Sequence, residues 1–220
     1  EQEERKKYFI EIMGSMGYSD RYWVGEVLAE HGIVCSENVT NQVSIYLKLL
    51  EKWNTKVNLT GLKNPKEMLV QLFAESFFAG RVLKKNDTPI VDVGSGAGFP
   101  GMALKILNPH WRFYLLEPRQ KRASFLAFVK GELGLLGIQI ICKTLEDCNP
   151  IDFYDSPRTV TFRGLGHLPD KLKHCNKLFS DQGKVVLFTT QNEWKKKLKD
   201  IEEIKWSNPI LIPWSRQKII

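Results

Sequence analysis

The stretch that decides the fold is Val91-Asp92-Val93-Gly94-Ser95-Gly96-Ala97-Gly98-Phe99-Pro100-Gly101. An apolar strand runs into three glycines at alternate positions, and a helix is expected to begin near Pro100. Because glycine has no Cβ, the backbone can turn sharply here and can approach a ligand closely. The stretch therefore predicts a nucleotide-type ligand at the carboxyl end of a buried strand.

Short β-rich runs alternate with helical segments around this turn. Such alternation predicts parallel pairing through right-handed crossovers. Two later runs, Ile204–Trp206 and 209–220, are expected to close the sheet, with a turn at Pro213–Arg216. We therefore predict an α/β fold with a mainly parallel sheet of six or seven strands. The five central runs are Pro89–Val93, Trp111–Leu116, Ile138–Cys142, Arg158–Phe162 and Lys184–Phe188.

The chain before the first strand has only helical patterning. Apolar residues from Val43 to Val57 recur at three and four positions, which lines one face of a helix. A turn before Pro65 then precedes a second helix that reaches about Leu83. The sequence predicts an N-terminal helical extension over residues 1–85 and an α/β domain over residues 86–220.

The composition of the chain indicates its cell compartment and the charge of its partners. The 32 Lys and Arg exceed the 25 Asp and Glu, and the net charge of +7 favours a polyanionic partner. No apolar run approaches about 20 residues, and the first residues are charged, so neither a membrane span nor secretion is expected. The cysteines lack metal-binding spacing. We expect a cytoplasmic monomer with reduced thiols and no metal; the cysteines are Cys35, Cys142, Cys148 and Cys175.

The spacing of the glycines distinguishes two ligand classes. A dinucleotide fingerprint would place its third glycine at position 99, which is Phe, whereas this chain has GxGxG with Asp92 two residues earlier. That pattern favours S-adenosylmethionine. Glu117 ends the second strand and could accept hydrogen bonds from both hydroxyls of a ribose, which either ligand would supply.

Four segments together resemble a known family. They are Tyr46–Leu69 (YLKLLEKWNTKVNLTGLKNPKEML), Val91–Pro109 (VDVGSGAGFPGMALKILNP), Lys121–Leu126 (KRASFL) and Glu132–Leu135 (ELGL). They are similar to the bacterial guanine-N7 methyltransferases of small-subunit ribosomal RNA, of the glucose-inhibited division protein B type. The resemblance implies a Rossmann-like class I methyltransferase fold, with S-adenosylmethionine as cofactor, S-adenosylhomocysteine as product, and 16S ribosomal RNA or the small ribosomal subunit as partner.

The resemblance also implies roles for individual residues. Glu117 would hold the ribose. Independently of the resemblance, Phe99 is the candidate to cover the ligand because it lies inside the turn. Arg163, just past the fourth strand, matches an arginine that the family keeps. Thr144, Leu145 and Glu146 would border the adenine. The methionine part would lie against the turn that follows Asp92, formed by Gly94, Ser95, Gly96, Ala97, Gly98 and Phe99, and Asp92 belongs to the same cofactor-binding set.

The chemistry of guanine N7 needs little from the protein. N7 carries a lone pair and no proton, so positioning in line with the donor matters more than a general base. Arg163 would donate to guanine O6 or to a phosphate, or alternatively form a structural ion pair. Asn58 would either cap the preceding helix or touch the substrate. These two residues are the catalytic candidates.

Candidate RNA contacts and departures from the family complete the prediction. Lys121 and Arg122 would bind RNA backbone, as would the more distant candidates Arg81, Lys84, Lys85, Lys195–Lys197 and Lys199.

In the helix before the first strand, Glu75 and Ser76 are the acid and serine that the chain retains and are expected at the RNA. Gln71-Leu72 and Thr190-Gln191 depart from the family. They leave two alternatives open, a methyltransferase with another acceptor and a non-catalytic RNA- or ribosome-binding paralogue.

Overall fold

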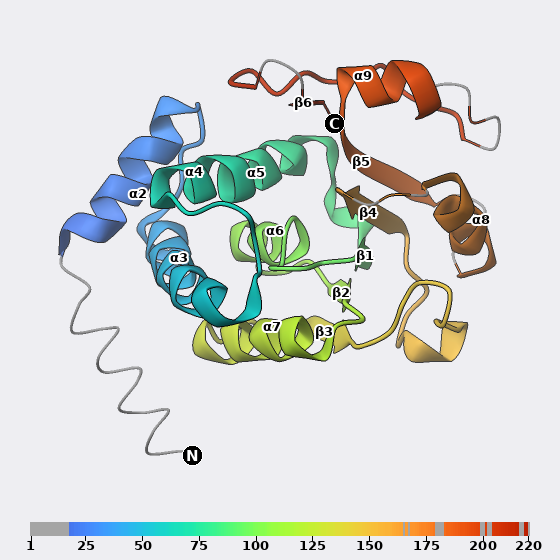
Figure 1. Ribbon diagram of the computed structural model, residues 1–220, viewed down its shortest axis with the longest axis horizontal. Helices are drawn as coiled ribbons and strands as arrows, with labels where there is room; N and C mark the ends of the chain where they lie inside the picture. Colours follow the sequence, from blue (N-terminus) through green and yellow to red (C-terminus); the bar gives the residue numbers. More distant parts are fainter. Residues whose placement is uncertain are drawn as a thin grey trace.

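The centre of the molecule is one sheet with strand order β3-β2-β1-β4-β5-β6 (Figure 1). This computed structural model describes residues 18–164, 166, 168–178, 183–198, 201, 204–215 and 218–219. Strands β1 to β5 pair in parallel, and β6 runs antiparallel to β5. The predicted mainly parallel sheet is confirmed. The strands are β1 Ile90–Val93, β2 Phe113–Leu116, β3 Ile138–Ile141, β4 Thr159–Arg163, β5 Lys184–Thr190 and β6 Lys218–Ile219.

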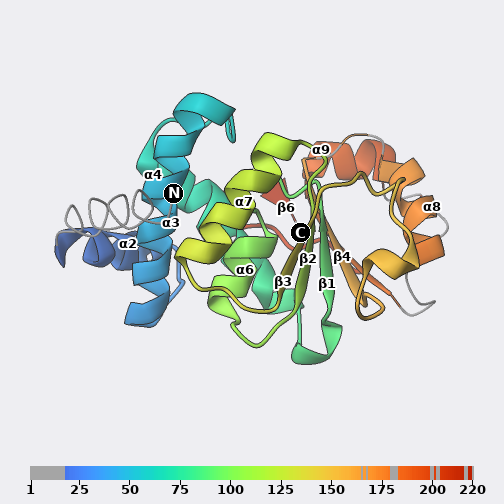
Figure 2. The ribbon, with the colours of Figure 1, turned by 90° about the horizontal axis from the view of Figure 1, so that it is seen from below.

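Helices cover both faces of this sheet. Figure 2 shows α6 (Gly101–Leu107) and α7 (Gln120–Glu132) on one face, on the same side as the N-terminal helices, and α8 (Leu168–Leu178) on the other. All residues of β1 and β2 are buried. Their nearly continuous apolar sequence suits strands that are covered on both faces.

The N-terminal part is helical from Tyr18 onward. Helix α3 begins after Ser36, whose Oγ accepts a hydrogen bond from Val39 N, and ends at Asn58 in the left-handed region with φ 49°. Asn64 caps the next helical stretch, which Pro65 begins as predicted. The elements are α2 Tyr18–Glu30, α3 Glu37–Val57, α4 Pro65–Met68, the π-helix η1 Leu69–Ala74, α5 Glu75–Ala79, and the 3-10 turns η2 Gly80–Val82 and η3 Lys85–Asp87.

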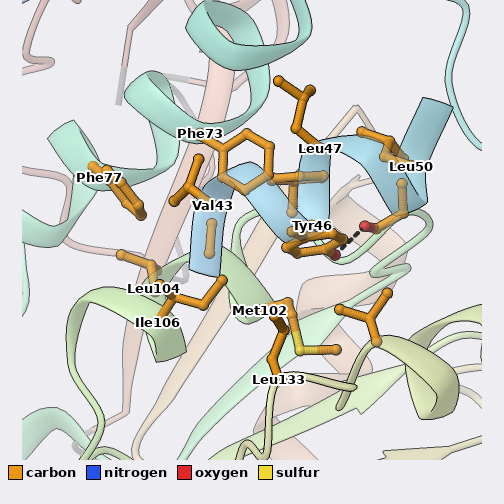
Figure 3. Packing of buried hydrophobic residues seen from close by; sticks show 14 of the residues in the cluster. Val43, Tyr46, Leu47, Leu50, Phe73, Phe77, Met102, Leu104, Ile106 and Leu133 are labelled. Carbon is orange, nitrogen blue, oxygen red and sulfur yellow. Dashed lines mark hydrogen bonds between the residues drawn. The ribbon is translucent and has the colours of Figure 1, made fainter. Parts of the chain in front are cut away.

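One hydrophobic core joins these helices to the sheet. It extends from Val24 in α2 to Phe188 in β5. Figure 3 shows Tyr46 of α3 in this core beside Phe73 and Met102. The Tyr46 hydroxyl donates a hydrogen bond to the Ala97 carbonyl oxygen at 2.5 Å. The helical extension is therefore attached directly to the glycine turn.

The end of the chain differs from the prediction. Ile204–Trp206 forms no strand; Trp206 packs edge-on against Trp194 at 5.1 Å instead. Trp194 begins the π-helix η5 (Trp194–Leu198), which follows α9 (Gln191–Glu193). The described part of the predicted last run pairs only at Leu211 and Lys218–Ile219, and Arg216 of the predicted turn lies outside the described residues. Within the described ranges, no helix is both long and apolar enough to cross a membrane.

Candidate cofactor and substrate site

The glycine turn leaves β1 through three residues with positive φ. The φ angles are 68° at Gly94, 56° at Gly96 and 92° at Gly98, a region that glycine enters without steric cost. Ser95 organises the turn from inside, because its Oγ donates to the Asp92 carbonyl oxygen at 2.9 Å and its carbonyl oxygen accepts from Gly98 N at 2.7 Å. The Ser95 side chain is thus bonded within the turn, and only backbone is left to approach a ligand.

Two of these glycines lie in different environments. A Cβ built on Gly98 would lie 2.1 Å from the Tyr46 hydroxyl oxygen, so this side of the turn is filled by core. A Cβ on Gly96 would have no atom closer than 3.8 Å, the nearest being an Arg122 guanidinium nitrogen and the Gly94 carbonyl oxygen. The turn is therefore open at Gly96, where a ligand can reach the backbone.

The Asp92 carboxylate forms hydrogen bonds that link β1 to the residue after the turn and to β4. Its Oδ2 accepts from Gly101 N at 3.0 Å, and its Oδ1 accepts from the Thr161 hydroxyl at 2.8 Å. Burial raises the pKa of Asp92 to about 6, although these hydrogen bonds partly oppose the rise. We predicted that Asp92 binds the cofactor. In the structure its carboxylate instead forms hydrogen bonds that stabilise the turn and the neighbouring strand β4. No sequence signal marks Thr161 as a partner of Asp92, but the parallel register of β1 and β4 pairs the two residues.

Glu117 lies at the turn, as the sequence predicts. It directly follows β2, is 3% exposed, and its Oε2 accepts a hydrogen bond from Gly96 N at 2.8 Å. Its Oε1 accepts from Arg119 N at 2.9 Å. Each carboxylate oxygen can accept a second hydrogen bond, so this arrangement fixes the side chain without exhausting its capacity for ribose hydroxyls.

Phe99 does not occupy the position that the sequence suggests. Its side chain is 6% exposed and packs against Tyr46, with ring centroids 5.4 Å apart and nearly parallel planes. Phe73 meets it edge-on at 4.8 Å. Because the ring is buried between the helical extension and the turn, it is not free to cover a ligand, and the prediction for its side chain is wrong.

The predicted adenine border follows β3 at the same edge of the sheet. Glu117 N donates to the Ile141 carbonyl oxygen at 3.1 Å, which places the ends of β2 and β3 together. The Thr144 hydroxyl donates to Asp147 at 2.6 Å, and Leu145 is buried. Glu146 is paired with Lys171 at 3.0 Å, and hydrogen bonds to its own backbone and to Lys171 lower its pKa.

Arg163 forms a buried ion pair at the end of β4. One guanidinium nitrogen donates to Glu75 Oε2 at 2.7 Å and also to the Gln71 carbonyl oxygen, and the other donates to Ser76 Oγ at 3.3 Å. Its guanidinium carbon lies 5.2 Å from the Phe188 ring centroid. Burial lowers the pKa of Arg163, while the Glu75 charge opposes this change. The structural ion pair considered from the sequence is present, with a helix residue as partner.

Glu75 and Ser76 are not at the surface where RNA could meet them. They are 2% and 0% exposed, and Glu75 also accepts from Lys218 Nζ at 2.8 Å. The prediction that they contact RNA is therefore wrong, because α5 turns both side chains toward Arg163. Lys218 was not predicted; no local pattern marks a lysine 143 residues from its partner.

The departures from the family meet at this same place. Gln71 Oε1 accepts from Lys218 Nζ at 3.3 Å, and Thr190 pairs with Lys218 in the β5–β6 register. Thr190 also caps α9 by accepting from Glu193 N at 3.2 Å. Gln71 and Thr190 are thus connected through Lys218, close to Arg163.

Asn58 and Arg122 contact each other across two elements. Arg122 donates to the Asn58 carbonyl oxygen at 2.9 Å, and Asn58 forms the end of α3. Lys121 is exposed beside Arg122. Lys84 and Lys85 precede β1 and so lie at the amino edge of the sheet, opposite the turn, where Figure 2 shows the chain entering β1. This position contradicts the prediction that they contact RNA at the site. Lys199 lies outside the described residues.

The sequence is similar to proteins of one family. A family model described as rRNA small subunit methyltransferase G matches residues 39–208. A protein of Shewanella piezotolerans named ribosomal RNA small subunit methyltransferase G is 34% identical over 73% of this chain and 75% of its own. One of Nitrosococcus oceani with the same name is 36% identical over 73% and 75%.

A solved structure supports the fold alone. A mutant of MtNAS crystallised in complex with S-adenosylmethionine superposes with a TM-score of 0.51 at 12% identity. The match covers 83% of this chain and 75% of that chain.

Proposed function

The chain belongs to the rRNA small subunit methyltransferase G family, and from this premise we propose that it transfers a methyl group from S-adenosylmethionine to N7 of a guanine in 16S ribosomal RNA. The observation that carries the proposal is the hydrogen bond from Gly96 N to Glu117 Oε2 at the open side of the turn. It sets a buried carboxylate beside accessible backbone, which suits the ribose of an adenosyl ligand.

The cofactor supplies an activated methyl group on a positively charged sulfur when it is bound. For the protein we assign Glu117 to the ribose hydroxyls, the backbone of residues 94–98 to the methionine part, and residues 144–146 to the adenine. A charged acceptor with two hydroxyl donors is favourable, since hydrogen bonds to ionised groups are about twice as strong as neutral ones. Asp92 and Ser95 act on the cofactor only by keeping the turn in shape.

Arg163 is the residue that we assign to the guanine. The register Val93↔Phe162 puts Arg163 next to Gly94 at the carboxyl edge of the sheet. Its guanidinium has five N–H donors, and the contacts with Glu75, Gln71 and Ser76 use three of them. A donor held in this way can bind guanine O6 and so orient the neighbouring N7 without giving up its ion pair.

A methylation assay tests this function. The protein is incubated with methyl-labelled S-adenosylmethionine and small ribosomal subunits that lack the modification. We expect label in one guanine of 16S ribosomal RNA, identified as N7-methylguanosine after digestion of the RNA to nucleosides. Label confined to protein or to small molecules would reject the proposal.

A second function has a specific observation in its favour. Gln71 and Thr190, which depart from the family, both meet Lys218 beside Arg163, so the surroundings of the proposed guanine-binding residue are altered. A methyltransferase with another acceptor would then retain cofactor binding but leave 16S ribosomal RNA unlabelled. A non-catalytic paralogue would bind RNA without turnover. The same assay, together with calorimetric titration of the cofactor, distinguishes the three outcomes.

We further propose that the protein acts in the cytoplasm as a monomer without a metal. Its ribosomal substrate is cytoplasmic, and methyl transfer to a nitrogen lone pair requires no Lewis acid. Light scattering should give the mass of one chain, and full activity should persist after treatment with a chelator.

A further inference from the structure

A cationic surface lies beside the open side of the glycine turn. Two segments of the chain contain basic residues and no acidic residue at all, residues 52–66 and residues 118–131. The first contains four lysines, and the second contains Arg119, Lys121, Arg122 and Lys130. The chain as a whole has 32 basic and 25 acidic residues, so two such acid-free segments are a local concentration of charge.

The fold brings the two segments together. The hydrogen bond from Arg122 to the Asn58 carbonyl oxygen joins the first turn of α7 to the end of α3. Figure 2 shows both of these ends on the side of the sheet where β1 and β2 finish. An Arg122 guanidinium nitrogen lies 3.8 Å from where a Cβ on Gly96 would stand. The combined charge therefore borders the proposed methyl-transfer site.

The loop after α3 is held in place by its own hydrogen bonds. The Asn54 side-chain oxygen accepts from Leu59 N at 2.8 Å and from Thr60 N at 2.9 Å, and its amide donates to the Leu62 carbonyl oxygen at 3.2 Å. The left-handed conformation of Asn58 turns the chain at the same point. A fixed loop presents its cations at a constant position, which reduces the entropy cost of binding.

Four of the cations are available to a partner. Each is exposed, and across the part of the chain that the structure describes none of the four forms an ion pair with a carboxylate. Arg122 is different, because it is half-buried and its guanidinium tethers the loop. The four are Lys56, Lys63, Arg119 and Lys121.

We propose that these four side chains form a docking surface for the RNA phosphate backbone next to the target guanine, with Arg122 and Asn58 as the tether that holds its two halves together. This inference rests on the proposed function and extends it to the loop of residues 58–64. Unpaired lysines and arginines bind phosphates mainly through charge and counterion release, and such interactions position a nucleic acid without reading its sequence.

A pair of matched charge reversals tests the docking surface. The test variant combines Lys63→Glu with Lys121→Glu, one from each half. The control combines Lys84→Glu with Lys85→Glu, which are exposed and lie at the opposite edge of the sheet. Both variants change the net charge equally. Binding to unmodified 16S RNA is measured against salt concentration, separately from methylation, and cofactor affinity is measured by calorimetry.

We expect the test variant to bind RNA about tenfold or more weakly at low salt, while the control binds like the wild type. The slope of log affinity against log salt should fall by about 0.7 to 0.9 for each phosphate that the variant no longer neutralises. Cofactor affinity should be unchanged in both; if the reversal lowers it, Lys63→Gln with Lys121→Gln replaces the test variant. Equal weakening in test and control, no weakening in either, or binding to anionic phosphatidylglycerol vesicles in place of RNA would overturn the docking surface.

These results are independent of the methyl acceptor. If the wild type fails to label 16S RNA, the proposed function fails. If it labels the RNA while the test variant keeps wild-type RNA affinity, only the docking surface fails.

Discussion

Two buried glutamates at the carboxyl edge of the sheet are held in different ways. Among the residues that the structure describes, Glu117 accepts hydrogen bonds only from backbone, from Gly96 N and Arg119 N. Glu75 instead pairs with two side-chain cations, Arg163 at 2.7 Å and Lys218 at 2.8 Å. They are equally buried, at 3% and 2% exposure, so burial alone does not distinguish their roles.

The difference lies in what remains for a ligand. Each Glu117 carboxylate oxygen accepts one backbone hydrogen bond and can accept another, which suits the hydroxyls of a bound cofactor. The Glu75 carboxylate forms ion pairs with Arg163 and Lys218, and these contacts fix the position of the Arg163 guanidinium. The proposed cofactor site around Glu117 is thus held by local backbone hydrogen bonds. The proposed guanine site at Arg163 depends instead on side chains from α5, β4 and β6.

Removal of Glu75 should have the largest effect. Glu75→Ala would leave Arg163 buried without its carboxylate partner, and breaking a buried pair in this way costs about 3–5 kcal/mol. Urea denaturation should show that decrease in stability, with cofactor affinity nearly unchanged in the folded fraction. Glu75→Gln, which retains an acceptor, should lose less. Stability equal to the wild type in Glu75→Ala would show that the pair does not hold Arg163.

The two sides of the glycine turn should respond differently to one methyl group. Gly98→Ala would press a Cβ against the Tyr46 hydroxyl, and we expect stability to fall by about 3 kcal/mol from overpacking and positive φ. The Cβ of Gly96→Ala would lie at ordinary contact distance, 3.8 Å from an Arg122 guanidinium nitrogen and from the Gly94 carbonyl oxygen, so only the positive φ should cost stability, by about 1 kcal/mol. This variant should nevertheless weaken cofactor binding. Thermal unfolding and calorimetry measure both effects; equal melting temperatures would contradict the distinction.

The pH dependence of stability should report Asp92. Its pKa is about 6 in the folded protein against an ordinary value of 3.8, so the folded state binds the proton more tightly. The resulting stabilisation is complete below pH 3.8 and is lost as the pH rises through about 6. The difference between the two pKa values corresponds to on the order of 3 kcal/mol.

Asp92→Asn is the control for that titration. Asparagine cannot ionise, so its stability curve should be flatter than that of the wild type between about pH 4 and about pH 6. Its amide oxygen can still accept from Gly101 N while its NH2 donates to the Thr161 hydroxyl, so its stability at low pH should stay close to that of the wild type. Parallel curves for the two proteins would place the titration at another residue.

The sequence predicts the parts of this molecule that depend on local pattern. The run Pro89–Val93 became β1 at Ile90–Val93, and the positions of Pro65 and Glu117 were correct because helix caps and strand ends have local signals. Phe99 was assigned to the ligand because it lies in the turn, whereas packing with Tyr46 decides its direction. The boundary at residue 85 stays a prediction, and one core crosses it.

Long-range pairing explains most of the remaining errors. Glu75 could not be separated from an RNA-binding residue by sequence, because its partners Arg163 and Lys218 come from distant strands. Ile204–Trp206 has a β-like composition, but Trp206 packs edge-on against the ring of Trp194 and its segment pairs with no strand among the described residues. The buried role of Asp92 likewise depends on Thr161, which only the sheet register brings within reach.

Calorimetric titration of S-adenosylmethionine into the wild type, Glu117→Ala and Gly96→Val tests whether the cofactor binds at the glycine turn. We expect clear binding by the wild type and binding weaker by about 1–3 kcal/mol in Glu117→Ala through missing charge-assisted hydrogen bonds. Gly96→Val should show no measurable binding, since its side chain would fill the open side of the turn. Wild-type affinity in both folded variants would mean that the cofactor binds elsewhere on the protein.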